Sequence, residues 1–241
     1  SLHDALPISD VGMHAPPPRV CGPGLPFSLR HLFQDRDVQR LIGDQPLEPL
    51  VLLLQLLEPL HLLQLQQHFN IQCFELGDDV DRPQLAAYQH CYQSFGHEID
   101  WMAFIDGDEF LFPTQADNLQ TALQPYTYEK MSALGVYWQC FGSSGHINDP
   151  DGLIIEDYKY RANLDFFGNK HIKSVVRGGQ GPYFSIKENA HLFNTIFGTF
   201  DEKMRPINNG LMNDLTPSYE HFRINHYVCQ SLEYFRTFKQ H

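Results

Sequence analysis

Two aspartates one residue apart are the first feature of this sequence that could do chemistry. Asp106 and Asp108 follow an apolar run, Trp101–Ile105, and Gly107 between them allows a sharp backbone turn. A short apolar run bounded by turn signals predicts a buried strand, and open α/β sheets bind ligands just outside the carboxyl ends of their strands. Mg²⁺ and Mn²⁺ prefer oxygen ligands of this kind, often shared with substrate phosphates. The pattern indicates a metal site, with a solvated acidic turn as the alternative.

A second group of candidate residues lies in a loop of small residues. Trp138 and Phe141 could stack on a sugar ring, and hydroxyl and imidazole groups for hydrogen bonding follow at Ser143, Ser144 and His146. Glycines in this loop permit close backbone approach to a ligand. We interpret the group as a sugar-binding loop; the alternative is an ordinary loop beneath two core aromatics.

Histidine and basic side chains complete the set of candidates. His226, and less directly His191, could add an imidazole ligand for a borderline cation such as Mn²⁺, although a lone histidine is more often structural. Lys173 and Arg177 alternate out of an apolar strand and could meet phosphate, unless they form an exposed strand face. Neither a G-x-S-x-G elbow nor a P-loop is present in the sequence.

Composition restricts the class of protein. The chain has 241 residues, 42% of them hydrophobic and 19% charged, which suits one globular domain. Its formal charge of −12 argues against a nucleic-acid partner, and five dispersed cysteines suggest reduced thiols. The most apolar stretch, Leu50–Leu65, is too interrupted to predict a membrane span, and the start does not resemble a signal peptide. We therefore expect a cytoplasmic protein, with or without association to a membrane.

Residues 1–68 differ in character from the rest. Ser1–Ser9 resembles a translated sequencing-adaptor oligonucleotide, and Val11–Pro26 is rich in proline and glycine. Leu47–Gln67 has low complexity, and either a helix pair broken at Pro59 or a frame-shifted translation could produce it. We expect residues 1–68 to be non-native or disordered, and residues 69–241 to form a partial domain.

From residue 69 onward strands and helices alternate, which predicts an α/β fold with a mixed sheet and flanking helices. Helix-start signals at Asp81 and Pro83 precede apolar residues at helical spacing that end at Gly96. We expect Trp101–Ile105 to be a central buried strand that places Asp106 and Asp108 on a cleft. Further strands are expected over 71–76, 132–138, 170–177 and 189–193, and further helices over 117–124 and 231–239.

Taken in order, these motifs resemble glycosyltransferase family 92 and related bacterial family-2-like glycosyltransferases. The matching pieces are Gln84–Cys91, Trp101–Phe110, Trp138–His146, Lys173–Arg177, His191 and Ile224–Tyr227 with Ser231. Each motif alone is weak, whereas the ordered set over residues 69–241 is specific.

The resemblance implies a GT-A fold, which is a Rossmann-like α/β fold, with its donor-binding N-terminal half missing or corrupted here. It implies sugar transfer from a nucleotide-sugar donor, with UDP-sugars as the first expectation, to a saccharide or glycoconjugate acceptor. Asp106, Asp108 and His226 would hold Mn²⁺ or Mg²⁺, and donor binding would involve Asp106, Asp108, Lys173 and Arg177. The acceptor would be bound by Trp138, Phe141, Ser143, Ser144 and His146.

An inverting enzyme would also need a carboxylate base near the acceptor hydroxyl, for which Glu156 and Asp149 are candidates. A non-catalytic carbohydrate-binding or structural fragment is the alternative function. A calcium-binding module is less favoured, because aromatic residues follow the aspartates where a calcium loop needs further ligands.

Overall fold

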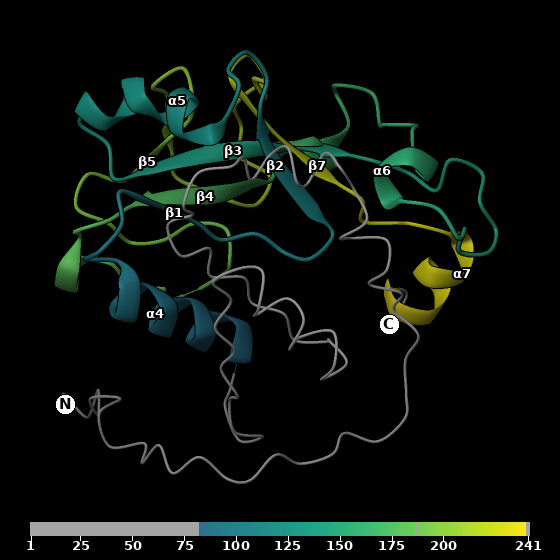
Figure 1. The fold of residues 1–241 in the computed structure, drawn as a ribbon, viewed down its shortest axis with the longest axis horizontal. Coiled ribbons are helices and arrows are strands. Elements are labelled where there is room, and N and C mark those ends of the chain that lie inside the picture. Colours follow the sequence, from purple (N-terminus) through teal and green to yellow (C-terminus); the bar gives the residue numbers. More distant parts are fainter. Residues whose placement is uncertain (1–81, 187, 240–241) are drawn as a thin grey trace, which may run out of the picture.

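The computed structural model describes residues 82–186 and 188–239, and Figure 1 shows their arrangement. The helices and helical turns are α4 (Pro83–Phe95), α5 (Leu119–Leu123), η2 (Gln124–Tyr128), α6 (Ile154–Asp157), η3 (Phe167–Lys170), η4 (Gly181–Tyr183), α7 (Leu232–Tyr234) and η5 (Phe235–Lys239). The strands are β1 (Trp101–Ala103), β2 (Glu109–Pro113), β3 (Ala133–Cys140), β4 (Ile172–Arg177), β5 (Thr199–Phe200), β6 (Pro206–Ile207) and β7 (Phe222–His226).

All seven strands belong to one mixed sheet organised around β3. Five strands lie in the order β1-β4-β3-β5-β6. The other two extend from β3 as a branch, in which β7 pairs with β3 on one side and with β2 on the other. β4 runs antiparallel to β3, whereas β5 pairs in parallel with the beginning of β3 and β7 in parallel with its end. β2 is antiparallel to β7. The structure is therefore mixed α/β, as the sequence predicts.

β3 is the most deeply buried strand because its residues are apolar or small nearly throughout. Seven of its eight residues are buried, and only Trp138 is half-buried. Gly135 is required by close packing, since a Cβ there would lie 2.6 Å from the Cδ1 atom of Ile207. A strand buried on both faces needs such an apolar run.

Helix α4 covers the sheet at β1 and β4. Pro83 favours helix initiation, and the amide of Gly96 at the other end donates to the carbonyl of Tyr92. Tyr88 and Tyr92 form the buried side of the helix, and the ring of Tyr92 stacks on Phe184 with centroids 3.8 Å apart. Burying aromatic rings of this size stabilises the layer by roughly 1.5–3 kcal/mol per side chain.

Helix α5 and the turn η2 pack against the other side of the sheet, as Figure 1 shows above β3. Asn118 caps α5 by accepting a hydrogen bond from the amide of Thr121 at 2.8 Å. Leu123 and Tyr126 then enter a core with Leu134 and Phe222. The two helical layers hold the strand ends that support the candidate site.

Several predicted elements are confirmed, and others are corrected. The helix ending at Gly96, the helix near 117–124 and the strands at β3 and β4 are present, and Ser231 caps the terminal helix by accepting from Tyr234. The strand in Trp101–Ile105 is confirmed only over Trp101–Ala103, and it is an outer strand of the described sheet rather than a central one. Residues 189–193 do not form a strand. The expectations for residues 1–68 and for a strand over 71–76 lie outside the described residues.

Four strands were not predicted: β2, β5, β6 and β7. β7 has a clear signal, because buried Phe222, Ile224 and His226 alternate with half-buried residues. Within the described residues, no helix is long and apolar enough to cross a membrane.

Candidate active site

The turn after β1 presents three carboxyl groups in four residues. The amide of Glu109 donates to the carbonyl of Asp106 at 3.1 Å, and the amide of Asp106 donates to Oε2 of Glu109, also at 3.1 Å. This reciprocal pair closes the turn, and Gly107 is exposed at its tip. The sequence therefore folds here into a compact acidic turn, Asp106–Glu109.

Asp106 is held by three side chains. Its Oδ1 accepts from Nε2 of Gln84 at 2.7 Å and from the hydroxyl of Tyr88 at 3.1 Å, both on α4. Its Oδ2 accepts from Nζ of Lys173 at 2.9 Å. The motif Gln84–Cys91 thus places two hydrogen-bond donors on this aspartate.

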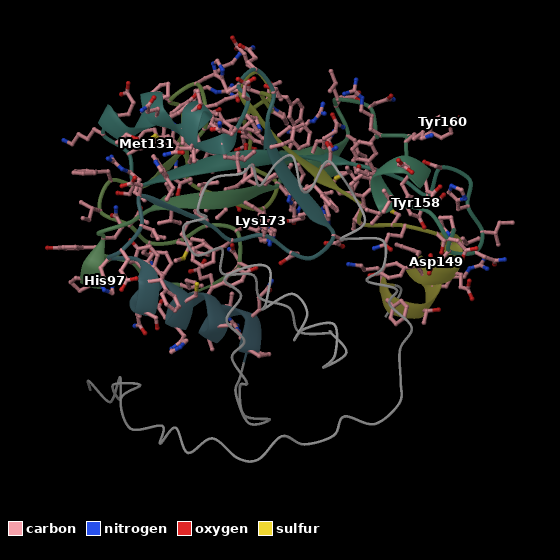
Figure 2. All side chains as sticks on the ribbon, in the orientation of Figure 1. His97, Met131, Asp149, Tyr158, Tyr160 and Lys173 are labelled. Carbon is pink, nitrogen blue, oxygen red and sulfur yellow. The ribbon has the colours of Figure 1, made fainter. Side chains whose placement is uncertain are left out.

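Lys173 reaches the turn from β4 and is almost completely buried, with 1% of its side chain exposed. Its ammonium also lies 3.9 Å from Oε1 of Glu109. A buried ammonium needs such partners, because isolated burial of a charge costs several kcal/mol. Lys173 is therefore close to the aspartates as predicted, but its burial directs it to Asp106 rather than to a ligand surface. Figure 2 shows it near the centre of the described structure.

Glu109 is a buried carboxyl that the sequence analysis did not single out. Burial raises the pKa of Glu109 to about 8, while the charge of Lys173 acts in the opposite direction. Its Oε1 atom has no hydrogen-bond partner within the part of the chain that the structure describes. In the sequence only its position next to Asp108, before an apolar run, could have indicated it; its pairing with His226 across the sheet appears only in the structure.

Asp108 points away from Asp106 and toward the C-terminal elements. Its Oδ1 lies 3.6 Å from Nε2 of His226, and its Oδ2 lies 3.2 Å from Nζ of Lys239. Burial raises the pKa of Asp108, but His226 and Lys239 outweigh it and lower the pKa to about 2. Asp108 is thus an ionised, mostly buried carboxylate beside an imidazole.

His226 meets Asp108 because β7 pairs with β2 and β3. Its ring also contacts Trp138, with centroids 4.1 Å apart, and its Nδ1 atom has no hydrogen-bond partner among the described residues. The expected approach of His226 to Asp108 is confirmed. No group of three or more histidine, cysteine, aspartate or glutamate side chains among the described residues is placed to bind a metal ion, so the expected triplet with Asp106 is not assembled.

Two further histidines surround Trp138. His171 stacks on the indole with centroids 4.8 Å apart, and His191 meets its edge at 5.3 Å. Nδ1 of His191 lies 2.8 Å from the carbonyl of Ile172, and burial lowers the pKa of His191 to about 4. Trp138 is therefore enclosed by imidazoles, and its Nε1 has no hydrogen-bond partner among the described residues.

Arg177 is not brought to the acidic turn. Its guanidinium donates to the carbonyls of Thr127, Glu129 and Met131, and it lies over the ring of Trp101 at 5.5 Å. Arg177 pairs with Trp101, at the opposite end of β1 from the aspartates. The N–H groups of Arg177 expected to bind phosphate thus donate to backbone carbonyls instead. Through these bonds Arg177 connects β4 to the loop before β3.

The loop after β3 is held by its own hydrogen bonds and by α7. The hydroxyl of Ser144 accepts from the amide of Tyr160 at 3.0 Å, and Oγ of Ser143 accepts from Gly145 at 3.4 Å. Nε2 of His146 lies 3.1 Å from the carbonyl of Asp157, and its own carbonyl accepts from Leu232. Phe141 packs on Tyr227, with centroids 4.7 Å apart. Phe141 and the loop thus lie next to β7, immediately beyond the residue that pairs with His226.

The two candidate bases differ in their surroundings. Asp149 accepts from the hydroxyl of Tyr158 at 3.4 Å, and Figure 2 places it beside α7. Burial raises the pKa of Tyr234 on α7, and the charges of Asp108 and Asp149 raise it further, so both aspartates lie close to this tyrosine. Asp149 is thus tied to Tyr158 and acts on a residue of α7, whereas Glu156 is exposed on α6.

Comparison with known proteins identifies the class of this domain. The sequence model of glycosyltransferase family 92 matches residues 57–235, which include the site residues described above except Lys239. The chain belongs to glycosyltransferase family 92. It is therefore a glycosyltransferase domain, and membership implies a sugar donor and an acceptor. No curated protein matches the chain.

Proposed function

We propose that this chain is a metal-dependent glycosyltransferase of the GT-A type, which transfers a sugar from a nucleotide-sugar donor to a saccharide or glycoconjugate acceptor. The observation that supports this most directly is the ionised carboxylate of Asp108 beside Nε2 of His226, at the edge of a mixed sheet in a family 92 chain. UDP-sugars are the first donors to test.

The chemistry of the donor set fits Mn²⁺ or Mg²⁺. Asp108 offers a carboxylate that stays ionised at neutral pH, and His226 offers an imidazole, which suits Mn²⁺ better than Mg²⁺. Lys239 now neutralises Asp108, and a cation would take over that charge. We assign the metal to Asp108 and His226, because Asp106 already accepts from three side chains. When bound, the cation supplies positive charge that stabilises the departing nucleoside diphosphate.

The remaining residues are given supporting roles. Lys173 acts through Asp106, which it orients together with Gln84 and Tyr88. Asp149 is the proposed base, since it lies with Asp108 close to Tyr234. Phe141 and the loop over 142–146 are proposed to contact the acceptor.

The test is release of nucleoside diphosphate from a panel of nucleotide sugars. With Mn²⁺ present the chain should release diphosphate, and excess EDTA should abolish the release, which added Mn²⁺ should restore. His226→Gln should weaken the Mn²⁺ dependence, whereas the exposed His97→Gln, as a matched control, should not. Saccharide binding with no diphosphate release from any donor, at any Mn²⁺ concentration, would instead support a non-catalytic carbohydrate-binding domain.

A further inference from the structure

Two arginines lie near each other on the far side of β7, and neither has an acidic partner among the described residues. Arg223 is half-buried on β7, and Arg161 is exposed in the segment that bridges to Phe141. No carboxylate within the described ranges forms an ion pair with either residue. Burial lowers the pKa of Arg223, and the positive charge of Arg161 lowers it further.

Sheet register places both arginines on one face. β7 lies between β2 and β3, with Arg223 opposite Phe112 and Asn225 opposite Gln139. Beyond β3, the amide of Ala162 donates to the carbonyl of Cys140 at 2.8 Å, which sets Arg161 beside Phe141. Because neighbouring residues of a strand point to opposite faces, this face is the reverse of the one that bears His226.

Unsatisfied polar atoms gather on the same face. Nε of Arg223, Oδ1 of Asn225 and Oε1 of Gln139 are buried and have no hydrogen-bond partner among the described residues. Gln139 is fully buried, and its Nε2 donates to the carbonyl of Ala162 at 3.2 Å. Buried polar atoms without partners cost free energy, which a ligand could offset only if these side chains turn toward it.

Aromatic rings flank these polar groups. The guanidinium of Arg223 lies over Phe112, 4.8 Å from the ring centre, which fixes its plane. Phe141 and Phe110 both pack against Tyr227, with centroids 4.7 and 5.5 Å apart. Figure 2 shows Tyr160, the neighbour of Arg161, at the outer edge of the molecule, and Arg161 itself is exposed.

We propose that this face, defined by Arg161, Arg223, Gln139, Asn225, Phe112 and Phe141, binds an acidic saccharide. A carboxylate or phosphate ester on the sugar would pair with the guanidiniums, which match the geometry of both groups. Sugar hydroxyls would bond to the amide group of half-buried Asn225, and the ring faces would contact the aromatic side chains. That this saccharide is part of the acceptor rests on the proposed function; the binding site itself does not.

Binding is measured by titration calorimetry on the whole chain with four probes: an oligogalacturonide, a sugar phosphate (mannose 6-phosphate), a neutral malto-oligosaccharide and inorganic phosphate. Arg161→Gln and Arg223→Gln remove one charge each. Lys159→Gln is the matched control, because it removes an exposed charge two residues from Arg161. Arg223→Lys keeps the charge but loses the guanidinium, and Arg161→Gln remains informative if variants at 223 do not fold.

We expect at least one acidic saccharide to bind roughly tenfold or more tightly than the neutral one, and the preferred acid identifies carboxylate or phosphate as the source. Each Arg→Gln change should weaken that binding about tenfold, with Lys159→Gln within twofold. Donor hydrolysis in Arg161→Gln should be unchanged, so loss of acid binding is distinguished from failure of the proposed transfer. Equal binding of acidic and neutral probes, equal weakening by Lys159→Gln, or binding of inorganic phosphate alone would overturn the proposal.

Discussion

Two acidic turns within residues 82–239 are stabilised in different ways. Asp106–Glu109 follows β1, and Asp201 with Glu202 follows β5. Glu202 accepts from the amides of Glu220, His221 and Phe222 and from Ser218, while Asp201 accepts from two amides and pairs with Arg205. The first turn relies mainly on long side chains and leaves Oε1 of Glu109 without a hydrogen bond.

This difference separates structural carboxylates from those available for chemistry. Backbone amides cannot leave, so the carboxylates of Asp201 and Glu202 are permanently occupied and join β5 to the start of β7. Side-chain donors such as Lys239 can move when a ligand arrives. Acidic residues at a strand end therefore indicate function only where mobile side chains satisfy them.

The largest effect is expected from removing the buried ammonium group of Lys173 from the first turn. Lys173→Met leaves Asp106 and buried Glu109 without their ammonium, and we expect a loss of about 3–5 kcal/mol in the free energy of unfolding. Urea unfolding measures it. Lys203→Met is the control, since the exposed Lys203–Glu220 pair should contribute at most about 1 kcal/mol. Equal stability of Lys173→Met and the wild type would show that the first turn does not depend on this cation.

The next effect is on catalysis. Asp108→Asn keeps the shape of the side chain but removes the charge proposed to hold the metal, so transfer should fall by about 10²–10³-fold. The melting temperature should fall moderately, because the ion pair with Lys239 and the interaction with His226 are weakened while the shape of the side chain is kept. Donor hydrolysis with a Mn²⁺ titration is the measurement, and exposed Asp117→Asn is the control. Normal turnover with unchanged Mn²⁺ dependence would remove Asp108 from the site.

The second turn should show the opposite pattern. Glu202→Gln replaces one accepting oxygen with an amide group that faces backbone donors, and it should cost about 2–3 kcal/mol of stability. The Mn²⁺ dependence of transfer should be unchanged. Glu220→Gln, at an exposed pair, is the matched control for thermal unfolding. A change in Mn²⁺ dependence without loss of stability would contradict the structural role of Glu202.

The last effect concerns the pH dependence of stability. Because burial lowers the pKa of His191 to about 4, the unfolded chain, with a histidine pKa near 6.5, binds more protons than the folded chain between these values. The contribution of His191 is complete above pH 6.5 and is lost as the pH falls toward 4, by at most about 1.4 kcal/mol per pH unit. Between pH 4 and 6.5 the melting temperature should depend less on pH in His191→Gln than in the wild type. In the exposed His97→Gln control it should depend on pH as in the wild type. If the melting temperatures of His191→Gln and the wild type change with pH in the same way, the pKa of His191 in the folded chain lies near the ordinary histidine value.

Local signals in the sequence predict much of this fold but only part of the site. Pro83 and Gly96 mark the ends of α4, and the apolar run of β3 indicates burial, since these features depend on nearby residues. Which side chains contact one another in the site depends on the register of the sheet, and the spacing of residues in the sequence does not determine that register. Lys173 and Arg177 are four residues apart on one strand, yet register sends the first to Asp106 and the second to the carbonyls of residues 127–131.

Glu109 and β7 show the same limit. A glutamate after an aspartate is usually solvated, and only pairing with β7 buries Glu109 opposite His226. β7 itself alternates buried and half-buried residues, so its period could have been recognised, but Arg223 and Asn225 within it weaken the apolar pattern.

The position of β7 between β2 and β3 has a consequence for how the protein folds. β7 is the last strand along the chain, and it pairs with two strands that begin about 90 and 115 residues earlier. During synthesis, the edges of β2 and of the end of β3 that pair with β7 therefore remain unpaired until β7 emerges from the ribosome. Exposed strand edges invite pairing with other chains, so this interval is the period of greatest aggregation risk. A nascent chain released before residue 222 would lack His226, the partner of Asp108, and would keep both edges open.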